Sequence, residues 1–181
     1  MFQWPFSAQR RTRRVVVDAL YGEIVAAARR PRFYSAWQVP DTPLGRFEML
    51  SLHLFLILHR LREEKGPSRD LAQELTDQFF LDVDHSLREL GIGDLGVPKR
   101  MKKLARMFYG RLSSYGQAVD AGDQAALAEA LRRNIAPERA VWSEAAALSA
   151  YVMEAHHALA AHAADEFLAG KLRFAALPQE E

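Results

Sequence analysis

Two short steps along the chain pair a carboxylate with a histidine, and both could in principle hold a metal. Glu154 and His157 form a Glu-x-x-His step, and Asp82 and His85 form a looser Asp-x-x-His step. Di-iron proteins use this spacing to turn both side chains into the core of a helical bundle. Helical periodicity instead turns Glu154 and His157 away from the apolar stripe of their segment. We therefore expect no metal site and rank a helical di-iron enzyme below the other functions.

Other catalytic chemistry finds no support in the sequence. Cysteine is absent, which excludes disulfides, thiolate metal sites and cysteine nucleophiles. Neither a Gly-x-Ser-x-Gly elbow nor a glycine-rich phosphate loop is present. His53 lies in the most apolar segment, where a buried, hydrogen-bonded histidine is the ordinary interpretation. We expect a protein that binds without catalysis and without a cofactor.

The clearest functional signal is a run of positive charge. Six basic residues and no acidic residue lie between Leu95 and Val119, in a chain whose formal net charge is only +1. On a helix, four of them project opposite the stripe of apolar residues, so folding leaves their charges in water. Such a face could attract anionic lipid, RNA phosphates or acidic parts of a client protein. It could also be a solvated surface whose charges are answered by neighbouring carboxylates.

Length and composition bound the architecture. The chain has 181 residues, 49% hydrophobic and 26% charged, as in an ordinary globular domain. The most apolar stretch, residues 49–58, is about half of the ~20 residues that a membrane-spanning helix requires. The arginine-rich start is not followed by the apolar run of a signal peptide. We expect a cytoplasmic protein, peripheral on the cytoplasmic face of the inner membrane if the basic run binds lipid.

Helical periodicity of apolar residues runs through the chain, and no segment shows the alternation of a strand. The pattern predicts an all-α, single-domain bundle of about six helices around a nearly all-apolar central helix from Pro43 to about Glu64. We expect Pro31 to end the first helix and residues 32–41 to form a loop. The predicted helix caps are Thr42, Ser68, Gly91, Asp123 and Ser143, and Pro98 is predicted to start the helix that carries the basic residues.

The two ends of the chain and one aromatic loop complete the layout. We expect a flexible arm over residues 1–12, a helical domain over residues 13–175 and a flexible tail over residues 176–181. The arm combines Phe2, Trp4 and Phe6 with arginines, which suits a lipid headgroup region or RNA as well as a loose leader. The aromatic residues at positions 33, 34 and 37 are interpreted as a staple between loop and core.

Four stretches in order resemble the ubiquinol-cytochrome c chaperone family. They are RRPRFY at 29–34, VPDTPLGRFEMLSLHLFLILHRL at 39–61, DVDHSLRELGIGDLGVPKRMKK at 82–103 and FYGRLSSY at 108–115. The series covers roughly two thirds of the chain, and the stretch LRELGIGDLGVPKRMKK is its most specific part. One departure is Gln38, which stands where the family commonly has glycine.

The resemblance implies an all-helical assembly factor for respiratory complex III that engages newly made cytochrome b near the inner membrane. It also makes the ribosome a candidate partner, beside an anionic membrane surface; no DNA partner is expected. A ribosome- or RNA-associated helical binding protein is the main alternative. The residues predicted to bind a partner or client belong to one helical corner and the helix after it: Arg88, Glu89, Asp94, Lys99, Arg100, Lys102, Lys103, Arg106, Tyr109 and Arg111.

Overall fold

The computed structural model describes residues 5–177, with side chains from residue 11 onward, and this part of the chain contains helices and no strands. The prediction of an all-α single domain is confirmed. Six helices have twelve residues or more, as expected, and two have only five. The helices are α1 (Pro5–Ala28), α2 (Pro31–Ser35), α3 (Pro43–Leu61), α4 (Pro67–Glu89), α5 (Val97–Asp120), α6 (Gln124–Ile135), α7 (Ala145–Ala160) and α8 (Ala164–Leu168).

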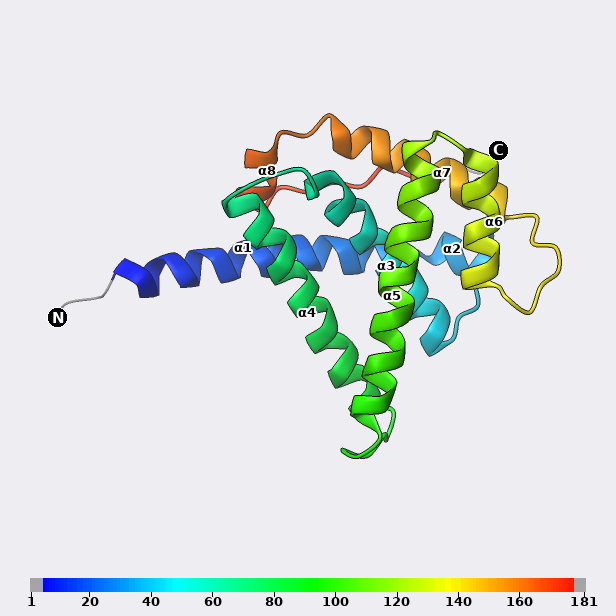
Figure 1. Ribbon diagram of the computed structural model, residues 1–181, viewed down its shortest axis with the longest axis horizontal. Helices are drawn as coiled ribbons and strands as arrows, with labels where there is room; N and C mark the ends of the chain where they lie inside the picture. The colour runs from blue at the N-terminus through cyan, green and yellow to red at the C-terminus, as the bar shows by residue number, and fades with distance from the viewer. Residues whose placement is uncertain (1–4, 178–181) are drawn as a thin grey trace.

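Helix α3 is the centre of the bundle, as predicted. It packs against α1, α4, α5, α6 and α7, and its residues from Leu52 to Ile57 are buried without exception. In Figure 1, α1 runs along the long axis while α4 and α5 form a hairpin that projects away from the body. Helices α6 and α7 cover the remaining side. No helix of the described residues is both long enough and apolar enough to span a bilayer.

The start of α3 follows the capping rules. The Thr42 hydroxyl accepts a hydrogen bond from the Gly45 amide at 3.1 Å, and Pro43 is the first helical residue. A glycine is required at position 45 for a steric reason. A Cβ at this position would lie 1.8 Å from the carbonyl oxygen of Pro40, so the chain entering α3 can pass only over a glycine.

Several predicted caps are confirmed and two are wrong. Asp123 accepts from the Ala126 amide at 2.8 Å, and Gly91 ends α4 with a φ of 78°. Helix α5 begins one residue before Pro98. Ser68 does not cap α4, because that helix begins at Pro67 and the serine is buried inside its first turn. Ser143 does not cap α7 either; the residue at that position is Glu144, whose side chain makes no capping bond.

The segment after α1, predicted to be a loop over residues 32–41, begins with a short helix. Helix α1 ends at Ala28, and Pro31 begins the short helix α2, because proline suits the first helical position. The aromatic staple is confirmed: Phe33 and Trp37 are buried against Tyr151 of α7. The Trp142 indole donates to the Trp37 carbonyl at 3.1 Å, which fixes the loop before α7 as well.

The segment after α8 returns across the molecule without regular structure. Leu172 and Phe174 are buried, and the Phe174 ring packs edge-on against His53 at 5.1 Å. Arg30 donates to the Ala175 carbonyl at 2.5 Å. Through these contacts residues 172–175 cover part of the hydrophobic core. The predicted boundaries at residues 12 and 176 stay predictions; α1 begins at Pro5, and residues 1–4 and 178–181 lie outside the described part.

Candidate binding groove and basic hairpin

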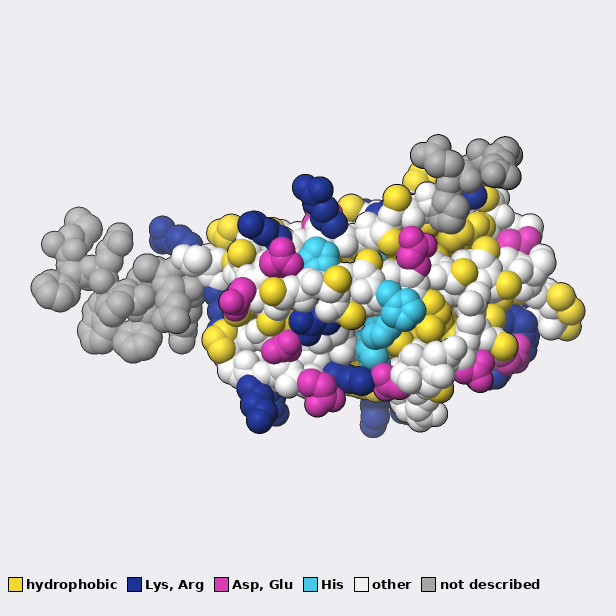
Figure 2. Space-filling view, turned by 90° about the horizontal axis from the view of Figure 1, so that it is seen from above, with side chains coloured by type: hydrophobic (Ala, Val, Ile, Leu, Met, Phe, Trp, Pro, Cys, Tyr) yellow, Lys and Arg dark blue, Asp and Glu magenta, His cyan; other side chains and the backbone are white. Residues whose placement is uncertain are grey.

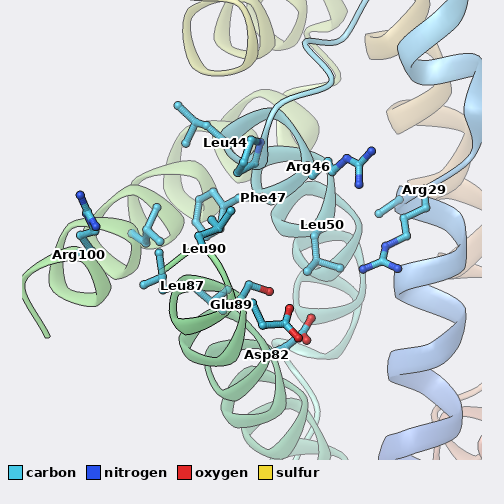
Figure 3. A pocket seen from close by; sticks show the side chains of 15 residues that line it. Arg29, Leu44, Arg46, Phe47, Leu50, Asp82, Leu87, Glu89, Leu90 and Arg100 are labelled. Carbon is cyan, nitrogen blue, oxygen red and sulfur yellow. The ribbon is translucent and has the colours of Figure 1, made fainter. Parts of the chain in front are cut away.

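A groove of about 500 Å³ opens between the end of α1, the start of α3, the end of α4 and the start of α5. Figure 3 shows side chains from all four helices converging on it. We call this feature the arginine-rimmed groove. It is lined by Ala28, Arg29, Pro43, Leu44, Arg46, Phe47, Leu50, Asp82, Val83, Ser86, Leu87, Glu89, Leu90, Arg100 and Leu104.

Apolar side chains form the floor of the groove. Phe47 and Leu50 come from one face of α3, and Val83 and Leu87 come from successive turns of α4. Spacings of three and four residues place such side chains on one face of a helix. Leu44 and Leu90 lie at the mouth, with 47% and 57% of their surface exposed. An uncovered leucine at either edge of an apolar groove is typical of a surface that receives another molecule.

Charged groups form the rim. Arg29 and Arg46 lie on the α1 and α3 side, and Arg100 lies across the groove on α5 (Figure 3). Arg46 donates to Asp41 at 2.6 Å, and this bond lowers the pKa of the Asp41 carboxyl. On the α4 side, Asp82 accepts a hydrogen bond from the Tyr21 hydroxyl at 2.9 Å. Burial, with the Asp82 charge second, raises the pKa of Tyr21, so this hydroxyl stays protonated.

The predicted basic run lies on α5, immediately beside the groove. Lys99, Lys102, Lys103 and Arg106 share one exposed face of the helix, which we call the α5 basic face. Within residues 11–177 none of these four forms an ion pair, and neither does Arg100. Nearby carboxylates have other partners: Asp84 and Asp94 bind Arg88, and Glu48 binds Arg111. The positive charge of the face is therefore uncompensated by contacts within the described part of the chain.

The corner between α4 and α5 is held by Arg88. Its guanidinium bonds Asp84 at 2.7 Å and also bonds Asp94. Glu89 lies 3.2 Å from the exposed side chain of His85. These contacts place Arg88, Glu89 and Asp94 at the base of the basic run. The three were predicted to belong to one surface with it, which stays a prediction.

Arg111 and Tyr109 differ from the other predicted residues. Arg111 points inward and pairs with Glu48, whose side chain is only 1% exposed, so its charge is neutralised inside the bundle. Burial raises the pKa of the Glu48 carboxyl, and the Arg111 hydrogen bonds oppose that shift. Tyr109 is 59% exposed, and its ring centroid lies 6.3 Å from that of Phe80. The structure thus separates Arg111 from the basic face and leaves Tyr109 at its edge.

The carboxylate–histidine steps do not form a metal site. Glu154 and His157 are exposed, and Asp82 is hydrogen-bonded to Tyr21. Among the described residues no group of three or more histidines, aspartates or glutamates is arranged to hold a metal ion. His53 has the ordinary interpretation: Nδ1 lies 2.8 Å from the Met49 carbonyl and Nε2 lies 3.0 Å from the Tyr151 hydroxyl.

Fold and site together define an all-helical protein with an apolar groove beside a free basic face. Residues 35–174 match the family model described as ubiquinol-cytochrome C chaperone, and the chain therefore belongs to this family of complex III assembly factors. The predicted resemblance is confirmed.

Two relatives give the extent of the similarity. The crystal structure of the Cbp3 homolog from Brucella abortus superposes with a TM-score of 0.90, at 53% identity over 97% of each chain. Ubiquinol-cytochrome-c reductase complex assembly factor 1 from Xenopus laevis is 24% identical over 103 residues, which are 57% of this chain. The match spans about half (51%) of that curated relative's length.

Proposed function

We propose that this protein is an assembly factor that binds newly made cytochrome b during biogenesis of complex III, and that the arginine-rimmed groove receives an apolar segment of this client. The observation that carries the proposal is the groove itself, an uncovered apolar surface in a chaperone of this family. Newly made cytochrome b exposes apolar segments before it is assembled. Holding one of them keeps it from aggregating.

The shape of the groove suits a few side chains of a helical or extended client segment. Each leucine-sized side chain that enters would contribute about 1.5–3 kcal/mol through burial of apolar surface. Leu44 and Leu90 at the mouth would extend that contact, because both are already exposed and need no rearrangement. Arg29 and Arg100 of the rim would favour client segments flanked by carboxylates or by a free helix C-terminus, whereas Asp82 and Glu89 on the α4 side would oppose them.

The test replaces the two mouth leucines without disturbing the core. Leu44→Gln and Leu90→Gln together should abolish cross-linking of the protein to newly translated cytochrome b and lower the cytochrome b content of membranes. The control is Leu81→Gln, since Leu81 lies on α4, is 58% exposed and does not line the groove. Unimpaired cross-linking by the double variant, with normal cytochrome b levels after deletion of the gene, would refute the proposal.

Salt dependence separates this function from ribosome or RNA binding. Affinity that comes from phosphate contacts falls steeply as salt rises, whereas burial of apolar surface depends on salt only weakly. The exposed α5 cations are the observation that keeps the alternative in view. We expect client capture to persist at high salt. A steep loss, together with protection by ribosomes or RNA, would favour the alternative.

A further inference from the structure

The connection between α4 and α5 carries the most exposed large apolar side chain among residues 11–177. Leu95 is 99% exposed. The α4–α5 connection that carries it is the end of the hairpin that projects from the body of the molecule (Figure 1). No described element of the chain covers this side chain. An isolated surface leucine is ordinary, but one at the end of a projecting hairpin has a defined geometry.

The exposure of Leu95 is fixed by the fold. Gly91 takes a φ of 78°, and the Ile92 amide donates to the Leu87 carbonyl at 3.2 Å, which turns the chain back. The Gly96 amide donates to the Gly93 carbonyl at 2.8 Å and closes a turn around Leu95. Val97, directly after it, is buried. The turn therefore directs one apolar side chain inward and presents Leu95 outward.

Uncompensated cations stand directly behind the tip. The α5 basic face extends from Lys99 to Arg106, eight residues that span about 10 Å of helix. From Arg88 to Arg106 the chain carries six basic residues against the two carboxylates Glu89 and Asp94. Asp94 is bound by Arg88, and Glu89 lies beside His85. If the hairpin lay with its α5 side against a flat surface, Leu95 and the α5 basic face would both meet that surface.

The opposite side of the molecule has a different character. Figure 2 shows the protein from above, the side away from the hairpin tip, and there the positive and negative side chains are interspersed. Ion pairs between Arg62 and Asp120 and between Arg60 and Glu64 lie at the C-terminal ends of α3 and α5, remote from the tip. On the hairpin, by contrast, the four cations of the α5 basic face lie on one helix face without an ion pair among the described residues.

We propose that the α4–α5 hairpin docks on an anionic lipid surface, with Leu95 inserted below the headgroups and the α5 basic face against them. An apolar tip with a basic collar matches both layers of such an interface. RNA would match the cations, and the exposed Tyr109 ring at the edge of the α5 basic face could stack a base, but RNA would leave Leu95 uncovered. Leu90 and Arg100, which line the arginine-rimmed groove, are close to the tip in sequence, so docking would turn the groove toward the membrane.

The absence of cysteine makes a direct test of insertion available. Leu95→Cys, labelled with an environment-sensitive fluorophore, should shift to shorter wavelength on phosphatidylcholine vesicles that contain phosphatidylglycerol. Val141→Cys is the matched control, because Val141 is 84% exposed in the loop before α7. It should show no shift. A shift at both positions, or at neither, would overturn the proposal.

Affinity for the same vesicles tests the basic face. Replacing Lys99, Lys102, Lys103 and Arg106 by glutamine should weaken vesicle binding on the order of several hundred-fold, and Leu95→Ser by about tenfold. The control is a second fourfold glutamine variant at exposed Lys65, Arg69, Lys171 and Arg173, which changes the net charge equally. Only the first set should reduce binding markedly.

Two further outcomes would overturn the proposal. The wild-type protein could bind phosphatidylcholine vesicles equally well with and without phosphatidylglycerol, which would remove the role of charge. It could instead bind an RNA homopolymer tightly and the anionic vesicles not at all, which would assign the basic face to nucleic acid. Neither result bears on the groove, because client capture is measured separately by cross-linking.

Discussion

Arg111 of α5 holds both carboxylate oxygens of Glu48 on α3, with Nε 2.9 Å from Oε2 and Nη2 2.6 Å from Oε1. The pair lies between two helices that also line the arginine-rimmed groove. Removing one partner of a buried ion pair leaves an uncompensated charge. Two helices of the site are therefore joined by a contact that is costly to break.

Arg111→Met should lower the free energy of unfolding by about 3–5 kcal/mol, because Glu48 would be left buried without its partner. Urea denaturation measures this loss. Arg106→Gln on the exposed face of the same helix is the control and should change stability little. The double variant Glu48→Leu with Arg111→Met should recover most of the loss. Equal stability of Arg111→Met and wild type would contradict the structural role.

His53 makes stability depend on pH. Burial lowers the pKa of His53 to about 4, while the unfolded chain keeps a value near 6.5. Between these values the unfolded state binds the proton and the folded state does not, so stability falls as pH drops from 6.5 toward 4. The shift corresponds to about 3 kcal/mol. Urea unfolding at a series of pH values measures it, and His53→Gln should show a flatter profile over that range.

Gln38 occupies a backbone conformation that favours glycine. Its φ is 54°, which costs a residue with a side chain about 1 kcal/mol. Gln38→Gly should raise the melting temperature by relieving this strain. Gln38→Ala keeps the strain and removes the hydrogen bond to Glu144, so it should not stabilise the protein. A melting temperature for the glycine variant below that of the alanine variant would contradict the strain argument.

Two glycines in helices should respond oppositely to alanine. Gly45→Ala places a Cβ against the Pro40 carbonyl and should destabilise the protein strongly, because backbone must move. Gly110→Ala meets nothing within 4 Å and should stabilise α5 by up to about 1 kcal/mol through helix propensity. Thermal unfolding of both variants gives the comparison. Losses of stability of similar size in the two variants would show that the backbone at Pro40 can move away from a Cβ at position 45.

Arg100 and Lys103 separate the two proposed surfaces. Arg100 lines the groove, whereas Lys103 faces solvent on the basic face. Lys103→Gln should weaken vesicle binding about fivefold and leave cytochrome b cross-linking unchanged. Arg100→Gln should reduce cross-linking as well. The same loss of cross-linking in both variants would mean that groove and basic face act as one surface.

Local rules were enough to predict much of the fold. The Thr42–Pro43 start of α3 and the Asp123 cap follow from side-chain chemistry alone. The basic face was found by the same reasoning. Its four residues recur at helical spacing opposite an apolar stripe, and the structure leaves them exposed.

The groove could not be predicted, because its residues have the same composition as the core. Phe47 and Leu50 of α3 resemble Leu52 and Phe55 in type, and only the angles between α1, α3, α4 and α5 decide which of them line the groove. Arg111 carried a signal that was missed. It follows Leu104 by seven residues, which places it on the inward stripe, and Glu48 is the acidic residue inside the otherwise apolar α3 segment.

The core around α3 is complete only once the segment after α8 has been synthesised. Phe174 closes the wall around His53 of α3, although more than a hundred residues separate the two in the sequence. During translation α3 therefore leaves the ribosome long before the residues that finish covering it. Vectorial synthesis would expose an apolar helix for most of that time. A chaperone for apolar clients thus has, while it is being made, the same vulnerability as the clients it is proposed to serve.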